Sequence, residues 1–168
     1  ENIMMAASLA SGTTNIFNAA TEPEVKNLGD FLRAMGADIS GHGSNQIKIK
    51  GVSHLKGCTH KVSADRIEAG TFMVAAAATR GQITMNGADP RELEVVTELL
   101  RESGAEVETS VDRIRVSMET RPRAVNIETA PFPGFPTDLQ AQFMVLNSVA
   151  KGKAFVREQI FENRFMHV

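Results

Sequence analysis

The sequence predicts an α/β fold (α+β in some classification schemes), built from units repeated about every 70 residues around buried, alanine-rich helices. Three observations support this prediction. A pattern of apolar helix, glycine and strand recurs at Gly12, Gly81 and Gly152. Amphipathic helical segments alternate with segments of period two. Other helical segments are apolar and almost free of charge, which is typical of helices buried on all sides.

Each of the first two units begins with one of these apolar helices, over residues 4–10 and 72–78. A glycine follows each helix, as expected of a left-handed cap, and a strand follows the glycine. A second, amphipathic helix comes next, over residues 24–35 and 92–103, because apolar residues recur there at spacings of three and four.

Both amphipathic helices end at a glycine, Gly36 or Gly104. Each is followed by two strands, which we place at 37–40 and 47–50 in the first unit and at 105–109 and 114–117 in the second. A unit is therefore expected to read helix, strand, helix, strand, strand.

A third unit starts with a buried-type helix over residues 139–150 and a strand after Gly152. Residues 163–168 resemble the start of its second helix. Because the pattern stops there and the chain begins without Met, we expect a piece of a longer polypeptide.

The composition of the 168 residues is that of a globular protein, with 42% hydrophobic residues, 18 Lys and Arg, and 20 Asp and Glu. The net charge of −2 and the absence of Trp and Tyr argue against a nucleic-acid partner. Neither a membrane span nor a signal peptide is predicted. The single cysteine, Cys58, suits a reducing compartment and a cytoplasmic location.

Two clusters of reactive or charged side chains have plain structural interpretations. His54, Cys58 and His60 lie close in sequence, but zinc sites need more ligands at tetrahedral spacing, so we predict no metal and a surface strand. Cys58 has no evident base partner that would make it a nucleophile. The basic segment Arg121-Pro122-Arg123 is expected to be a solvated turn.

A proline-rich segment, residues 129–138, is the strongest candidate for a site. Its three prolines and Gly134 predict a stiff loop that leads into the third buried helix. Thr137 or Asp138 then falls at the position of an N-cap. The alternative is that the loop holds the Asp138 carboxylate at a cleft as a general base, and this makes Asp138 the leading catalytic candidate.

Residues 160–165 form the second candidate segment, since polar and apolar side chains alternate there at a strand-to-helix turn. Such turns often contact ligands. The simpler alternative is an ordinary helix start, with Glu162 near the positive end of the helix dipole.

Five stretches together resemble the enolpyruvyl transferases, and the likeness extends over the whole chain: residues 1–7, 20–25, 65–72, 135–143 and 160–168. They resemble the branch that acts on UDP-N-acetylglucosamine more than the shikimate-pathway branch. The resemblance implies two domains, each an inside-out α/β barrel of three repeated units. Residues 1–62 would be the last unit of one barrel, and residues 63–168 the first unit and part of the second unit of the other.

The resemblance also implies an activity: transfer of the enolpyruvyl group of phosphoenolpyruvate to the 3-hydroxyl of UDP-N-acetylglucosamine, with release of phosphate, in peptidoglycan synthesis. It implies no metal or organic cofactor. The family's cleft lysine, phosphoenolpyruvate-binding arginines and loop cysteine match no residue of this chain, and Cys58 is not that cysteine.

By the same resemblance, Asp138 is the catalytic and sugar-binding carboxylate. The backbone of Ile160 contacts the UDP-sugar, and Phe161 and Arg164 line the same site. Asp65 and Arg66 match the crossover between the domains. Phe132 stands where the family often has histidine, which leaves that position without a polar group.

Two other classes of function compete with the enzyme. The first is a non-catalytic, repeat-built α/β module that serves only binding or assembly. The second, more distant, is a nucleic-acid binder, which the net charge disfavours. Because its buried-type helices lack partners, the fragment is also expected to self-associate.

Overall fold

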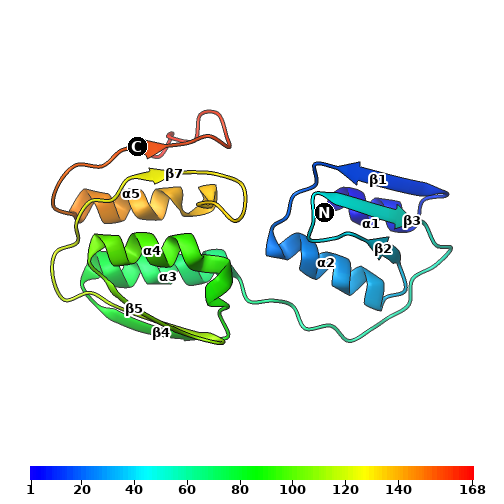
Figure 1. Ribbon diagram of the computed structural model, residues 1–168, viewed down its shortest axis with the longest axis horizontal. Helices are drawn as coiled ribbons and strands as arrows, with labels where there is room; N and C mark the ends of the chain where they lie inside the picture. The colour runs from blue at the N-terminus through cyan, green and yellow to red at the C-terminus, as the bar shows by residue number, and fades with distance from the viewer. The chain divides into compact units, whose positions relative to one another are not determined.

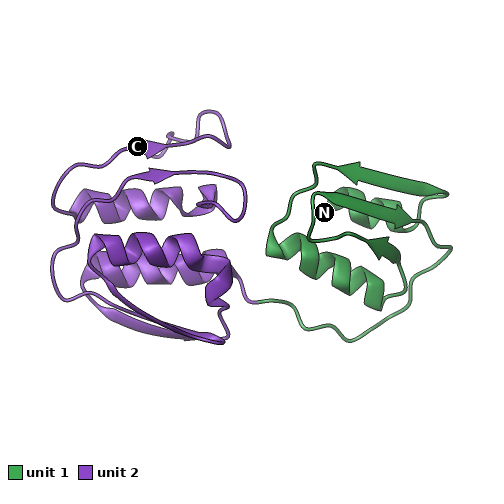
Figure 2. Cartoon of the chain, viewed as in Figure 1, with its two compact units in different colours: residues 1–63 green, residues 64–168 purple.

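The computed structural model describes all 168 residues, which form two compact units, Glu1–Ser63 and Ala64–Val168 (Figure 2). Both units combine helices with antiparallel strands, so the predicted mixed fold class is confirmed. None of the helices combines the length and the apolar character that crossing a bilayer requires.

The first unit has the predicted order of helix, strand, helix, strand, strand (Figure 1). Its strands form one antiparallel sheet in the order β1-β3-β2. Ile39 and Ile49 face each other across the β2–β3 pair, and both are buried. The elements are α1 (Asn2–Ser8), β1 (Thr13–Phe17), α2 (Pro23–Ala34), β2 (Asp38–Ser40) and β3 (Gln46–Lys50).

The second unit repeats this arrangement with the sheet order β4-β6-β5, again antiparallel, so the predicted repeat is confirmed. Its amphipathic helix differs at the start, where Asp89 caps a 3-10 turn that precedes α4. The elements are α3 (Arg66–Thr79), β4 (Gln82–Asn86), η1 (Pro90–Leu93), α4 (Glu94–Ser103), β5 (Glu106–Ser110) and β6 (Arg113–Ser117).

The remaining residues add a helix and two short parallel strands to the second unit. Residues 162–167 are turns, not the predicted start of a helix. Asn163 has a φ of 57°, which a right-handed helix excludes. The elements are β7 (Ile127–Glu128), η2 (Thr137–Leu139), α5 (Gln140–Val149) and β8 (Val156–Arg157).

The predicted glycine caps are present after both amphipathic helices, where Gly36 and Gly104 have φ values of 104° and 105°. The end of α3 differs from the prediction. Arg80 takes the left-handed conformation there, and the Gly81 amide donates to the Ala76 carbonyl. The cap of α3 is therefore Arg80, one residue before the predicted cap, Gly81.

The apolar helices are buried on one side only, which corrects the expectation that they are buried all round. In α1, Met4 and Ala7 lie in the core of the first unit, whereas Ile3, Met5 and Leu9 are exposed. In the second unit, Phe72 of α3 and Val145 and Val149 of α5 are also exposed. The described elements therefore leave apolar surface on these helices uncovered.

Helix α3 and η2 approach closely because α3 carries a glycine at the contact. A Cβ at Gly70 would lie 2.5 Å from Cδ1 of Leu139, a fully buried residue of η2. Phe135 and Phe143 pack edge to face beside this contact, with ring centroids 5.0 Å apart. This packing fixes the place of η2, the element that contains Asp138.

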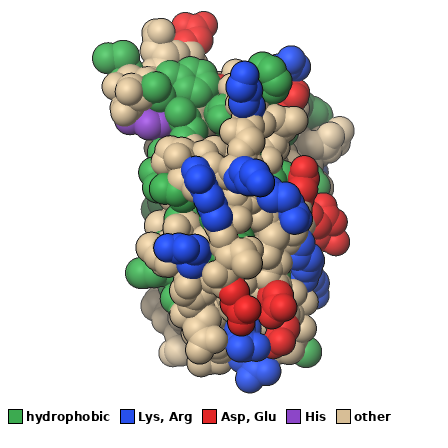
Figure 3. Space-filling model, turned by 90° about the vertical axis from the view of Figure 1, so that its left-hand side faces the viewer, with side chains coloured by type: hydrophobic (Ala, Val, Ile, Leu, Met, Phe, Trp, Pro, Cys, Tyr) green, Lys and Arg blue, Asp and Glu red, His purple; other side chains and the backbone are tan.

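Arg121 and Arg123 cap helix ends, so the prediction of a merely solvated turn is wrong. The Arg121 guanidinium donates to the carbonyls of Val149 and Ala150 at the end of α5, at 2.9 Å each. Arg123 donates to the carbonyl of Glu102 in α4. In Figure 1 the carboxyl ends of α4 and α5 point to the left. Figure 3 views that side of the second unit and shows several Lys and Arg side chains on it. Cations are favourable there because the carboxyl end of a helix carries partial negative charge.

We predict that this chain self-associates through the exposed apolar sides of its helices, a second copy being the partner. In light scattering over a concentration series, the Phe72→Ser/Val145→Ser double variant should shift toward the monomer. The control Val111→Ser, in the exposed turn between β5 and β6, should not. A wild-type monomer at all concentrations, unfolding cooperatively, would contradict the prediction.

Candidate active site

The proline-rich loop is closed on itself and anchored in the core. The Ala130 amide donates to the Phe135 carbonyl at 3.0 Å, and the Gly134 amide donates to the Pro131 carbonyl at 2.8 Å. Phe135 is buried against the core of the second unit. The loop is therefore the stiff lead into η2 that its prolines predict.

Asp138 is not a helix cap. Pro136 precedes η2 and Leu139 precedes α5, and neither helix receives a side-chain cap. The two cap candidates are engaged elsewhere, because Thr137 Oγ1 donates to Glu158 Oε2 at 2.9 Å and Asp138 Oδ1 accepts from Arg164 Nη2 at 2.8 Å. The capping interpretation is thus wrong, and the Asp138 carboxylate, 58% exposed, stands at the surface.

Arg164 brings the second predicted segment to Asp138. Its guanidinium also lies 5.4 Å from the ring centroid of Phe161, a cation–π contact. The left-handed residue Asn163 lies between Phe161 and Arg164 in the chain. Three of the four residues predicted to bind substrate, Asp138, Phe161 and Arg164, therefore form one connected cluster.

Glu158 joins the two segments, and the sequence analysis missed it. Its Oε1 accepts from the Thr129 hydroxyl at 2.8 Å and from the amides of Ile160 and Phe161 at 2.8 and 3.2 Å. Its Oε2 accepts from the Thr137 hydroxyl and, at 3.0 Å, from Gln140 Nε2. One carboxylate thus links the end of β7, the start of η2 and α5, and the turn after β8. Ile160, the fourth predicted binding residue, reaches the cluster through this link.

The surroundings of Glu158 lower the pKa of its carboxyl group and so favour the charged form. Burial by itself raises the pKa of this carboxyl, but donation from the Ile160 amide and the Thr129 and Thr137 hydroxyls lowers it further than burial raises it. Donors that point at a carboxylate favour its charged form. The sequence signal was faint: a lone glutamate two residues before the conspicuous 160–165 segment.

Asp65 and Arg66 have structural partners in the second unit. Asp65 is the N-cap of α3, and its Oδ1 accepts from the amides of Ile67 and Glu68 at 2.8 and 3.0 Å. Arg66 is buried, with its guanidinium 5.6 Å from the ring centroid of Phe132. Phe132 therefore offers Arg66 an aromatic face at this position.

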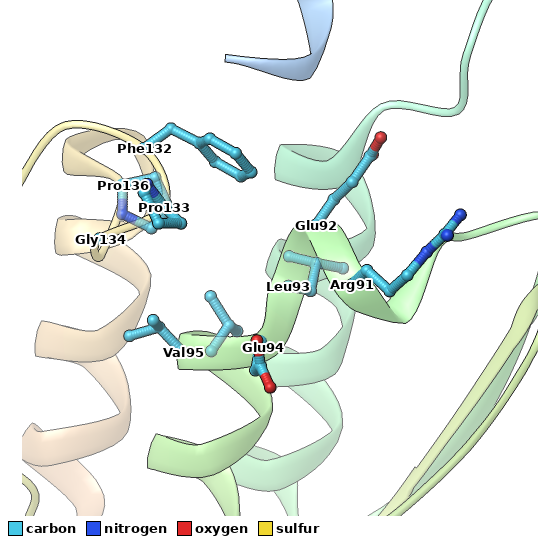
Figure 4. A pocket seen from close by; sticks show the side chains of 10 residues that line it. Arg91, Glu92, Leu93, Glu94, Val95, Phe132, Pro133, Gly134 and Pro136 are labelled. Atoms are coloured by element: carbon cyan, nitrogen blue, oxygen red, sulfur yellow. The ribbon is translucent and has the colours of Figure 1, made fainter. Parts of the chain in front are cut away.

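A shallow pocket lies between the proline-rich loop and the start of α4 (Figure 4). Phe132, Pro133 and Pro136 form one wall, and residues 91–96 form the other. Figure 4 shows the Phe132 ring reaching from the loop toward the Glu92 side. Asp138 does not line this pocket, so the pocket and the Asp138 cluster are separate features of the loop.

The His54–His60 segment contains no strand, contrary to the prediction. His60 stacks on Phe31, with ring centroids 5.0 Å apart, and Cys58 is exposed. No group of three or more His, Cys, Asp or Glu side chains in the chain is placed to hold a metal ion.

Comparison with known proteins gives the family. The sequence model described as EPSP synthase (3-phosphoshikimate 1-carboxyvinyltransferase) matches residues 1–168, so the chain belongs to this family of carboxyvinyl transferases. Among its relatives are the UDP-N-acetylglucosamine 1-carboxyvinyltransferases of Shewanella putrefaciens and Shewanella amazonensis. Each is 57% identical to it over 169 residues. The matches cover 100% of this chain and 40% of each relative, so the chain spans well under half of their length.

Two solved structures support the fold. The enolpyruvyl transferase NikO from Streptomyces tendae matches with a TM-score of 0.79 at 23% identity, covering 95% of this chain and 39% of that chain. An EPSP synthase from Acinetobacter baumannii matches with a TM-score of 0.55 at 23% identity, covering 92% and 37%. The fold is thus that of the enolpyruvyl transferases, and the predicted inside-out α/β class is confirmed.

We predict that Glu158 stabilises the chain at neutral pH and that this contribution disappears in acid. Its folded-state pKa lies below the unfolded value of about 4.3. Its contribution is therefore complete above that value and is lost as the pH falls through the folded value. Denaturant melts of the wild type and Glu158→Gln between pH 7 and 3 should show a stability difference that shrinks on acidification.

The wild type and the variant are compared because other carboxylates also make the stability of the chain depend on pH. Hydrogen bonds from Lys26 and from Arg91 lower the pKa values of Asp30 and Asp89. Their effects cancel between the wild type and Glu158→Gln. A difference independent of pH would contradict the assignment of an ionised Glu158.

Proposed function

We propose that the polypeptide containing this chain transfers the enolpyruvyl group of phosphoenolpyruvate to the 3-hydroxyl of UDP-N-acetylglucosamine and releases phosphate. The observation that carries the proposal is the 57% identity, over the whole chain, to relatives named for that sugar nucleotide. The cluster of Asp138, Phe161 and Arg164 supports it, because it joins the two segments through which the chain resembles these enzymes.

In the proposed reaction, Asp138 is the general base. The 3-hydroxyl oxygen of the sugar forms a bond to C2 of phosphoenolpyruvate, its proton passes to Asp138, and C3 gains a proton from a group elsewhere in the protein. The bond from C2 to the phosphate oxygen then breaks, C3 loses a proton, and the double bond is restored. The products are the enolpyruvyl ether and inorganic phosphate, and Asp138 also assists this elimination.

The neighbours of Asp138 would present it to the sugar. Arg164 holds Oδ1 at 2.8 Å, and we assign the proton transfer to Oδ2. Phe161, more than half exposed, offers an apolar wall, and the backbone of Ile160 contacts the sugar nucleotide. A fixed carboxylate is an efficient base because the reacting groups are already oriented.

We also propose that the two units belong to different domains of the whole protein. Residues 1–62 would be the last unit of one barrel, and residues 63–168 the first unit and part of the second unit of the other. The uncovered helix sides of α1, α3 and α5 support this, since neighbouring units would bury them. The activity belongs to cytoplasmic peptidoglycan synthesis, which is linked to cell shape and division.

The isolated 168-residue chain is predicted to be inactive. Phosphoenolpyruvate carries three negative charges that need fixed cationic partners. Arg164 is the cation that contacts Asp138. Because the Asp138 carboxylate already offsets its charge, Arg164 does not supply the cationic partner that phosphoenolpyruvate needs. A phosphate-release assay with both substrates should give no turnover, and measurable turnover would contradict this division of the site.

In the whole protein, Asp138→Asn is predicted to lower kcat by about 10²–10⁴-fold, the usual effect of removing a general base. The fold should persist, because an exposed ion pair contributes only about 0–1 kcal/mol and asparagine still accepts from Arg164. Affinity for the sugar nucleotide should also fall, since a charge-assisted hydrogen bond becomes a neutral one.

The matched control for this substitution is Asp112→Asn, the same chemical change in the exposed turn before β6. It should leave both the steady-state kinetics and the melting temperature unchanged. Near-normal turnover by Asp138→Asn with an unchanged melt would show that Asp138 has no catalytic role.

A further inference from the structure

The Glu158 carboxylate is surrounded by donors from segments that are distant in the sequence. Thr129 is 29 residues from Glu158, Thr137 is 21 and Gln140 is 18. Thr129 and Gln140 are almost completely buried. Hydrogen bonds from several segments to one carboxylate fix the relative positions of those segments.

All five donors are uncharged, and two of them are backbone amides. The hydroxyls of Thr129 and Thr137 are able to rotate toward a different acceptor, but the amides of Ile160 and Phe161 only donate. The Thr129 hydroxyl also accepts from the Gln159 amide at 2.8 Å. The turn after β8 therefore depends on an acceptor at position 158 for its conformation.

The network adds polar contacts to the apolar packing that folds the unit. Leu139, Phe143 and Leu146 are fully buried and hold η2 and α5 against the core. Glu158 instead acts on the two surface segments that carry the candidate site. One contains Thr137 beside Asp138, and the other contains Ile160, Phe161 and Arg164.

We propose that Glu158 is a positioning residue of the sugar-nucleotide site: its carboxylate holds the turn after β8 against the start of η2, so that Arg164 and the backbone of Ile160 stand beside Asp138. This role rests on the proposed function. Glu158 contacts no reacting atom and acts through the groups that it orients. Its loss should weaken sugar-nucleotide binding more than it weakens the fold.

The test is Glu158→Gln in the whole protein, with Glu119→Gln as the matched control on the exposed segment after β6. Glutamine has nearly the same size, but it replaces one acceptor oxygen by an NH2 donor and makes the other oxygen a weaker, uncharged acceptor. Hydrogen exchange at the Ile160 and Phe161 amides, measured without ligand, should accelerate in Glu158→Gln and not in Glu119→Gln.

Calorimetric titration with UDP-N-acetylglucosamine should show a Kd about 10-fold higher in Glu158→Gln, the factor expected if the displaced turn after β8 loses about one hydrogen bond to the sugar nucleotide. The KM for the sugar nucleotide should rise in parallel, while the KM for phosphoenolpyruvate stays within about 2-fold, a change of less than 0.5 kcal/mol. If Glu158 had only a structural role, Glu158→Gln would lower the melting temperature without raising one KM more than the other.

Thr137 supplies an independent pair of variants. Thr137→Val removes the donor to Glu158 Oε2 with little change of shape, and Thr137→Ser retains it. The valine variant should reproduce part of the rise in Kd, and the serine variant should rescue it. Equal behaviour of the two variants would overturn the proposed role of the network.

The outcomes separate this inference from the proposed function. If the wild type neither binds the sugar nucleotide nor turns over, the proposed function fails and the inference fails with it. If the wild type is active and Glu158→Gln binds the sugar nucleotide equally well, only the inference is overturned. Unchanged exchange at the Ile160 and Phe161 amides would overturn it as well.

Discussion

The candidate site depends on one ionised carboxylate that is almost enclosed by hydrogen-bond donors. Glu158 accepts from two hydroxyls, a side-chain amide and two backbone amides, and these bonds outweigh the effect of burial on its pKa. The donors come from the end of β7, from η2 and α5, and from the turn after β8, so the network joins segments that are distant in the sequence. In the role that we propose for Glu158, this network brings Arg164 to Asp138, with which it pairs at 2.8 Å.

The rest of the second unit holds the network in place. Gly70 lets Leu139 pack closely on α3, which fixes η2, and the proline-rich loop restricts the approach to Asp138. Arg121 and Arg123 stabilise the carboxyl ends of α5 and α4, where partial negative charge accumulates. Rigid elements thus support a site that is itself on loops and helix ends, as binding sites commonly are.

The repeat explains how a chain of this composition forms sheets with a defined register. In both three-stranded sheets the strand that comes last in the chain, β3 or β6, is central and pairs with the other two, so its alternating residues, such as Ile49 and Val116, are buried on one face. The helices that start the units are different. Each of them carries apolar side chains that its own unit leaves exposed, and this exposure supports the proposal that they belong to larger barrels.

The sequence alone determined the order of the elements in the first two repeats and the stiff loop before Asp138, because periodicity, glycine caps and prolines act within a few residues. It also pointed to Asp138, Ile160, Phe161 and Arg164. Only the tertiary structure decided that Asp138 pairs with Arg164 instead of capping a helix, that Arg121 and Arg123 cap two helices, and that Glu158 joins the site. Those partners lie about twenty to thirty residues apart. Hydrogen bonds between residues so far apart produce no periodic pattern from which the sequence could predict them.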